Sequence, residues 1–150
     1  MRWSEYLASL PAEVHDDLLT ALTLGAGHLQ RAAQLRQANR PLTAVVGALA
    51  TAYTALTTAV SLAETTTATP LPVPALWGSL SEERLVLTWS AFRVAHPAAA
   101  FPLATQLAQA NVAGVAIRQT TAEDASVDQV LAAVQQCLVA LAGVRQQVAG

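Results

Sequence analysis

Apolar residues recur at helical spacing along almost the whole chain, and the alternation typical of strands is scarce. A short first helix is predicted over residues 2–9, and Pro11 then opens a longer helix that stops near Asn39. Pro41 opens a third helix, which extends to about Thr66. The sequence therefore predicts an all-α fold.

Three more helices are predicted in the second half of the chain. Residues 79–82 have the spacing of a capping box, so we expect a helix from there to about Ala95. Pro97 stops that helix, Pro102 is expected to start the next, and Ser126 begins a second capping box before the last one. We find no domain boundary and no solenoid-type repeat.

A stretch rich in Pro and Thr, at about residues 67–79, separates the third predicted helix from the fourth. It is long for a loop between neighbouring helices, so we expect a connector that crosses from one end of a bundle to the other. A chain of 150 residues buries enough surface for one core. We therefore predict a single-domain bundle of four to six helices over residues 1–150.

The helix predicted over residues 41–66 is the most informative segment, because no charge appears between Arg40 and Glu64. A surface helix would carry a charged face, so we expect this helix to be surrounded on all sides. Its large side chains form one seam through which coiled-coil-like packing on a partner is predicted. The candidate interface residues are those of the seam and two aromatic residues near the start of the chain: Leu42, Val46, Leu49, Tyr53, Leu56, Val60, Trp3 and Tyr6.

Composition sharpens this picture. Charged residues make up 12% of the chain, about half of the usual share, and the formal net charge is −2. The high apolar content argues against disorder, and the lack of excess cations argues against a nucleic-acid partner. So few charges cannot coat a monomer of this size, and large exposed apolar patches usually mark interfaces.

Candidate chemistry is sparse. Cys137 lies on the apolar side of the last predicted helix without a cation beside it, and no His has a Glu three positions before it as di-iron bundles require. A phosphate-binding glycine loop between a strand and a helix is also missing. We therefore predict that the protein is not an enzyme and that it has no catalytic, cofactor-binding or metal-binding residue.

These observations favour a non-catalytic interaction or scaffold protein that self-associates or docks on another helical protein. The alternative is a bundle that binds a small apolar ligand or pigment in its interior, where Gly25, Gly27 and Gly47 could leave room beside His28 or His96. Membrane insertion of the uncharged helix is less favoured, because Ala and Thr gain little in lipid, but this option stays open.

Cellular location follows only from general features. The chain start does not resemble a signal peptide, so we expect a cytoplasmic protein. All eight basic residues are Arg, and the abundance of Ala beside them suggests GC-rich coding in a bacterium.

Overall fold

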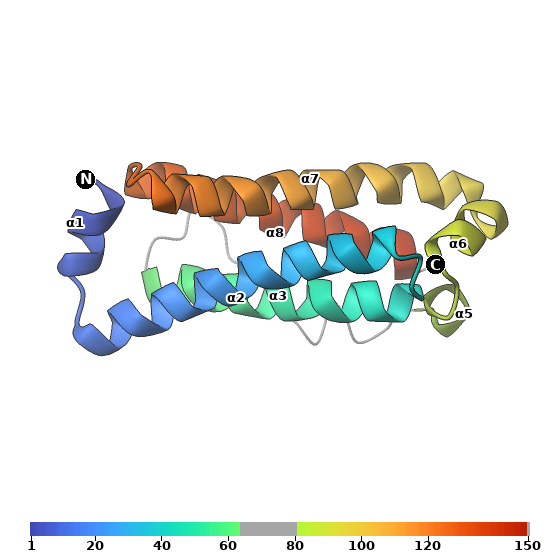
Figure 1. The fold of residues 1–150 in the computed structure, drawn as a ribbon, viewed down its shortest axis with the longest axis horizontal. Coiled ribbons are helices and arrows are strands. Elements are labelled where there is room, and N and C mark those ends of the chain that lie inside the picture. Colours follow the sequence, from blue (N-terminus) through green and yellow to red (C-terminus); the bar gives the residue numbers. More distant parts are fainter. Residues whose placement is uncertain (64–80, 150) are drawn as a thin grey trace.

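The computed structural model describes residues 1–63 and 81–149 and confirms the all-α prediction (Figure 1). The regular structure of these residues consists of seven helices. They are α1 (Trp3–Ala8), α2 (Ala12–Gln37), α3 (Leu42–Ala63), α5 (Glu82–Leu85), α6 (Trp89–Ala95), α7 (Pro97–Ala122) and α8 (Val127–Ala149). The crossover predicted at about residues 67–79 lies outside the described residues.

Four long helices lie side by side as two antiparallel hairpins (Figure 1). α2 and α3 form the first hairpin, and α7 and α8 form the second. The hairpins pack with α2 against α7 and α3 against α8. α1 lies at one end of the bundle beside the α7–α8 turn, whereas α5 and α6 lie at the other end beside the α2–α3 turn.

The two hairpins are repeats of one unit, a short helix followed by two long ones. α2 and α7 have 26 residues each. Trp3-Ser4-Glu5-Tyr6 opens the first short helix and Trp89-Ser90-Ala91-Phe92 opens the second, and a proline follows each motif at the same distance, Pro11 and Pro97. This duplication, which is not of the solenoid type, was not predicted.

Each short helix caps the turn of the opposite hairpin. Asn39 and Asp124 hold the turns with backbone φ angles of 57° and 54°, a left-handed conformation that short polar residues tolerate. The Asn39 Oδ1 accepts hydrogen bonds from the backbone N and the Oγ of Ser90, at 3.0 and 2.7 Å. Asp124 accepts the same pair from Ser4, both at 2.7 Å. The two units are therefore locked reciprocally.

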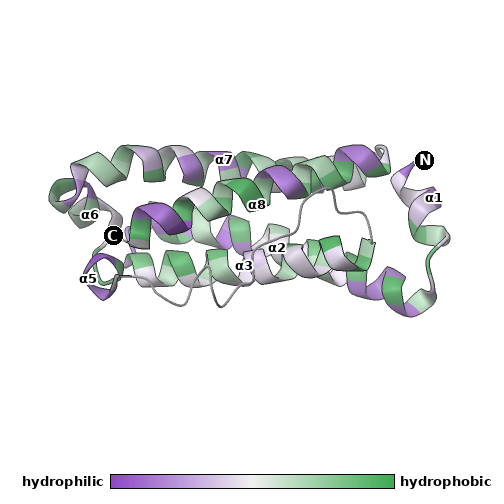
Figure 2. Cartoon of the chain, turned by 180° about the vertical axis from the view of Figure 1, so that it is seen from behind, coloured by the Kyte–Doolittle hydropathy of each residue, from purple (hydrophilic) through white to green (hydrophobic). Residues whose placement is uncertain are grey.

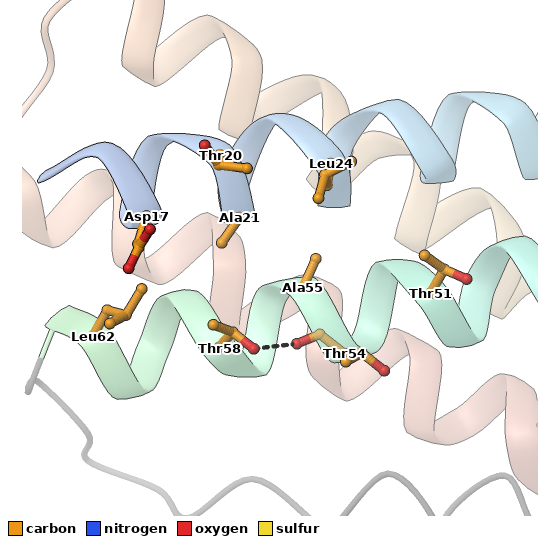
Figure 3. A pocket seen from close by; sticks show the side chains of 9 residues that line it. All are labelled: Asp17, Thr20, Ala21, Leu24, Thr51, Thr54, Ala55, Thr58 and Leu62. Carbon is orange, nitrogen blue, oxygen red and sulfur yellow. Dashed lines mark hydrogen bonds between the residues drawn. The ribbon is translucent and has the colours of Figure 1, made fainter. Parts of the chain in front are cut away.

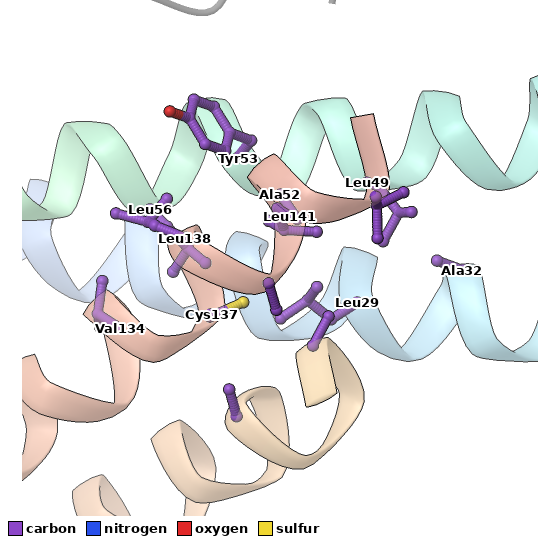
Figure 4. Close-up of a cluster of buried hydrophobic side chains, with 14 of the residues drawn as sticks. Leu29, Ala32, Leu49, Ala52, Tyr53, Leu56, Val134, Cys137, Leu138 and Leu141 are labelled. Carbon is purple, nitrogen blue, oxygen red and sulfur yellow. The ribbon is translucent and has the colours of Figure 1, made fainter. Parts of the chain in front are cut away.

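The core runs between the hairpins and is built from equivalent positions of both units (Figure 4). Leu56 of α3 and Leu141 of α8 are fully buried, as are Leu18 of α2 and, at 1% exposed, Leu103 of α7. None of the buried side chains in the described residues is charged or strongly polar. Burial of aliphatic side chains therefore supplies the main stabilisation of the bundle.

Two predicted helix boundaries differ from the structure. The helix expected up to Ala95 is two helices, because the Leu87 carbonyl accepts a hydrogen bond from the Leu42 N at 2.7 Å and Thr88 caps a new start. This division raises the helix number above the predicted range. The helix expected to start at Pro102 is α7, which begins at Pro97, since a proline at the first helical position loses no hydrogen bond.

The prediction that the third helix is surrounded on all sides is wrong for the single chain. Twelve of the 22 residues of α3 are buried, but one strip along its length is exposed. Figure 2 shows that α3 has no strongly hydrophilic turn, so this strip is uncharged yet open to solvent. The exposed residues are Thr43, Gly47, Thr51, Thr54, Thr58 and Ser61.

Candidate functional site

A groove of about 550 Å³ opens on the surface between α2 and α3 (Figure 3). Ala21 and Ala55 form its floor because their short side chains leave space between the two helices. Leu24, which is 48% exposed, and Leu62 add apolar surface. The remaining lining residues are Asp17, Thr20, Thr51, Thr54 and Thr58.

The hydroxyl groups of the threonines on the α3 side of the groove donate hydrogen bonds to carbonyl oxygens of their own helix. Thr51 Oγ1 donates to the Gly47 carbonyl at 3.0 Å, and Thr54 Oγ1 donates to the Ala50 carbonyl at 3.0 Å. Thr58 does the same with the Thr54 carbonyl at 2.9 Å. With these donors occupied, the wall of the groove offers mainly methyl groups to an incoming ligand or helix.

The charge at the groove is confined to one end. Asp17 lies beside Leu62, where α2 begins and α3 ends (Figure 3). The rest of the lining is aliphatic or hydroxyl-bearing. Such a surface can accept an apolar ridge with one cationic or hydrogen-bond-donating group at its end, but it offers no acid–base pair for catalysis.

The second hairpin shows what the equivalent surface looks like when it is filled. Gln106 of α7 stands where α2 has Ala21, and Gly143 of α8 stands where α3 has Thr58. A Cβ placed on Gly143 would lie only 2.5 Å from the Gln106 Cδ, so the glutamine side chain lies directly over that glycine. The two hairpins have therefore diverged at this position, and the first is the one that keeps an open groove.

The residues that the sequence singled out for an interface lie elsewhere. Trp3 and the six seam residues of α3 are at most 6% exposed and pack inside the bundle. Tyr6 is half-buried, and its hydroxyl donates to the Ala63 carbonyl at 2.9 Å. In the single chain these side chains hold the fold together, and the groove lies on another face of the same helix.

The candidates for chemistry remain isolated. Cys137 is fully buried in the core (Figure 4), and this burial raises the pKa of its thiol from 9.0 to about 12. His28 is half-buried, and its Nδ1 has no hydrogen-bond partner among the described residues. Within those residues, groups of three or more His, Cys, Asp or Glu side chains that could hold a metal ion are absent.

The glycines considered for an interior ligand cavity do not surround one space. A Cβ on Gly25 would lie 2.6 Å from the Leu56 Cδ2, so that position is already filled. Gly27 and Gly47 are exposed and have nothing within 4 Å of the same point. Among the described residues, the space available for a ligand is therefore the surface groove rather than these glycine positions.

In the part of the chain that the structure describes, two helices are long and apolar enough to span a membrane by length and composition, Leu42–Ala63 of α3 and Val127–Val148 of α8. About half of each apolar window is buried inside the bundle, 50% for α3 and 44% for α8. Core helices of water-soluble bundles have the same character, so these two features alone do not assign a membrane location.

Comparison with protein-family models, with curated proteins and with solved structures finds no significant match. The site must therefore be interpreted from its own geometry. The signal that sequence reasoning missed is the repeat of Trp, Ser, an aromatic residue and Pro at equal spacing, which relates the short helices of the two halves by 86 positions (Trp3 to Trp89). The long helices are related by 85 positions, as the turn residues Asn39 and Asp124 show, and this register comes from the structure. It pairs Ala21 with Gln106 and so reveals the groove.

Proposed function

We propose that this protein is a non-catalytic helical interaction protein that self-associates, with the α2–α3 groove as the contact surface. The single observation that carries the proposal is the open groove itself, whose counterpart in the other hairpin is covered by Gln106. A second copy would present an apolar helix ridge to the groove. Docking on a different helical protein through the same groove is the other form of this proposal.

The orientation of α3 supports an interface with protein rather than with lipid. The large side chains of α3, such as Leu49 and Leu56, point into the bundle, and the small residues lie outside. A helix in a bilayer is usually packed the other way, with small residues between helices and large ones towards the lipid. Small exposed residues allow the backbone of a partner helix to approach closely.

Sedimentation equilibrium at micromolar concentration tests the proposal. We expect the unchanged protein to form dimers or larger species, and Thr54→Lys, which places a charge on the groove wall, to shift it to monomer. Thr43→Lys is the matched control, because Thr43 is an exposed threonine of the same helix outside the groove. A monomeric unchanged protein without a co-purifying partner would refute the proposal.

A second candidate function is the binding of a small apolar ligand in the groove. Its volume of about 550 Å³ falls within the usual range of ligand sites, and its lining is largely apolar. Native mass spectrometry of the purified protein distinguishes the two functions. A bound small molecule that is lost in Ala21→Gln would favour the ligand, whereas a doubled protein mass would favour self-association.

For the whole chain we propose one bundle domain over residues 1–150 in which residues 67–79 act as the crossover connector. The described residues support this proposal, since α3 ends at one end of the bundle and α5 begins at the other (Figure 1). We also propose a bacterial cytoplasmic location, without a cofactor and without a nucleic-acid partner.

A further inference from the structure

Charged residues gather at the two ends of the bundle and have opposite signs there. At the α1 end acidic residues dominate, among them Glu13, Asp16, Asp17, Glu123 and Asp128. At the end formed by α5 and α6, basic residues outnumber the two glutamates Glu82 and Glu83. That set comprises Arg36, Arg40, Arg84, Arg93 and Arg145.

The basic end also carries the two most exposed large apolar side chains of the described residues, Val94 and Phe101. Val94 of α6 is 84% exposed, Phe101 of α7 is 79% exposed, and Val86 after α5 is 69% exposed. Figure 1 shows that α6 and the first turns of α7 project beyond the ends of the other long helices. Exposed apolar side chains among arginines therefore occupy a projecting corner of the molecule.

The internal repeat supplies a reference for this corner. Phe101 occupies the position that Asp16 has in α2, and Val94 stands where α1 has Ala8. Asp16 and Ala8 are exposed, so at these two surface positions an acidic and a small residue are replaced by large apolar ones. The packing of the fold does not require the change, since the first unit folds with the other residues. Arg93 stands where α1 has the buried Leu7, so a core position of the first unit carries a cation in the second.

Trp89 organises the cations at this corner. The guanidinium carbon of Arg36 lies 5.5 Å from the centre of the Trp89 ring, and that of Arg93 lies 5.9 Å from it. Both distances fall in the range of cation–π contacts, which hold guanidinium groups in place without neutralising them. The positive charge of both arginines thus remains available to an anionic partner.

We propose that this corner, formed by α6, the start of α7 and the arginines around Trp89, binds the surface of an anionic lipid bilayer. Phe101 and Val94 enter the boundary between headgroups and acyl chains, while the arginines contact the lipid phosphates. The acidic α1 end is repelled by the same surface, so the long axis of the bundle stands away from the membrane. This inference concerns a surface distinct from the α2–α3 groove and does not rest on the proposed self-association.

A bilayer suits this surface better than the acidic end of a second copy. Separate projecting apolar side chains can each enter a fluid interface, whereas a protein partner needs a matching hollow for every one of them. In the described residues, the α1 end offers Met1 as its strongly exposed apolar side chain, so it supplies charge but little apolar surface for Phe101 and Val94.

Vesicle flotation with the full chain tests the proposal. We expect binding to vesicles of phosphatidylcholine mixed with phosphatidylserine, little binding to phosphatidylcholine alone, and weaker binding as salt is raised. Phe101→Asp, which installs the residue type found at the equivalent position of α2, should lower the affinity by about tenfold or more. Arg93→Gln should lower it by about fivefold, the effect of one cation near the surface.

Two variants control for general effects of charge and exposure. Val112→Asp places the same new charge at a different exposed apolar residue of α7, 69% exposed and away from the corner, and Arg2→Gln removes a cation at the opposite end. Both should bind the mixed vesicles as the unchanged protein does. Absence of binding to the mixed vesicles, or equal losses in test and control variants, would overturn the proposal.

One further measurement separates the membrane from a second copy as the partner of the corner. If Phe101→Asp and Arg93→Gln changed the mass of the protein in solution while leaving vesicle binding intact, the corner would contact another copy and the proposal would be wrong. An unchanged mass with lost vesicle binding would support it. Loss of self-association in Thr54→Lys would test the groove alone and would leave the proposal for the corner unaffected.

Discussion

The side chain of Leu56 occupies the space that a side chain at Gly25 would need. A Cβ on Gly25 would lie 2.6 Å from the Leu56 Cδ2 and 2.8 Å from its Cγ, and Leu56 is fully buried between the hairpins. The glycine therefore lets α2 and α3 approach closely at this level of the bundle.

Gly25→Ala should destabilise the protein by about 1–3 kcal/mol, because the fully buried Leu56 side chain would have to shift to admit the added methyl group. This loss should appear although alanine is intrinsically the better helix former by about 1 kcal/mol. Chemical denaturation measures the free energy of unfolding directly.

Gly27→Ala is the matched control, two residues along the same helix. A Cβ there meets nothing within 4 Å, so the variant should be more stable by up to about 1 kcal/mol. The double variant Gly25→Ala with Leu56→Ala should lose less stability than the sum of the single losses. If Gly25→Ala were as stable as Gly27→Ala, the close approach of the helices would be disproved.

The lock between α1 and the α7–α8 turn should depend on pH. Hydrogen bonds from the Ser4 hydroxyl and then from its backbone N hold the pKa of Asp124 below the ordinary value of 3.8. A carboxyl with a lowered pKa stabilises the folded state above its ordinary pKa, and the contribution is lost as pH falls through the lowered pKa. We therefore expect the contact between α1 and this turn to weaken in strongly acidic solution.

The amide chemical shift of Ser4, followed by NMR as pH is lowered, reports this loss. Ser90 provides the internal control, since it makes the same pair of hydrogen bonds to the carboxamide of Asn39, which does not titrate. The Ser4 signal should move while the Ser90 signal stays. Equal movement of both signals would show that the whole bundle, and not the carboxyl, responds to acid.

Asn39, the turn residue of the first hairpin, should tolerate replacement by Asp, the residue type at the equivalent turn position Asp124 of the second hairpin. Asn39→Asp keeps an acceptor for Ser90 and a residue type that adopts positive φ, so we expect a small change in stability. Asn39→Ala loses both hydrogen bonds and strains the backbone at φ 57°, and should cost about 2 kcal/mol. Thermal unfolding of the two variants checks the order, and equal midpoints would contradict it.

Cys137 should be inert in the folded protein. Burial raises the pKa of its thiol from 9.0 to about 12, so thiolate forms readily only after unfolding. The folded protein should react with a thiol-specific reagent at the rate of global opening, and the denatured protein at once. Fast reaction of the native protein would show that Cys137 is accessible.

The same shift makes the folded state less stable in alkaline solution. The contribution of the protonated thiol to the free energy of unfolding is fully present below pH 9.0. It is lost as pH rises towards about 12, by at most about 1.4 kcal/mol per pH unit. Cys137→Ala, which lacks the group, should show a shallower decline of the free energy of unfolding over this range. Parallel declines in the two proteins would contradict the assignment.

The helices were predictable because period and capping signals act locally. The seam from Leu42 to Val60, predicted as a contact surface for a partner, lies on the side of α3 that is buried in the single chain, and the exposed strip opposite it was not foreseen. Threonines such as Thr54 and Thr58 bond to their own helix, so a face without charge can still lie in solvent. Absence of charge alone therefore does not distinguish a covered face from an open one.

The groove could not be predicted from one hairpin. It exists because Ala21 is short, and its significance becomes clear only beside Gln106, which covers the equivalent surface of the other hairpin. Few residues besides the aromatic, serine and proline positions reveal the duplication in the sequence. Spatial equivalence of the turns at Asn39 and Asp124 was needed to align the halves.

We propose that the α2–α3 groove receives a second copy of the chain. Sedimentation equilibrium of the unchanged protein and of Ala21→Gln, which fills the groove with the side chain used by the other hairpin, tests this proposal. We predict concentration-dependent association of the unchanged protein and a folded monomer for Ala21→Gln. Equal association of the two proteins, or a compact monomer in both, would refute the proposal.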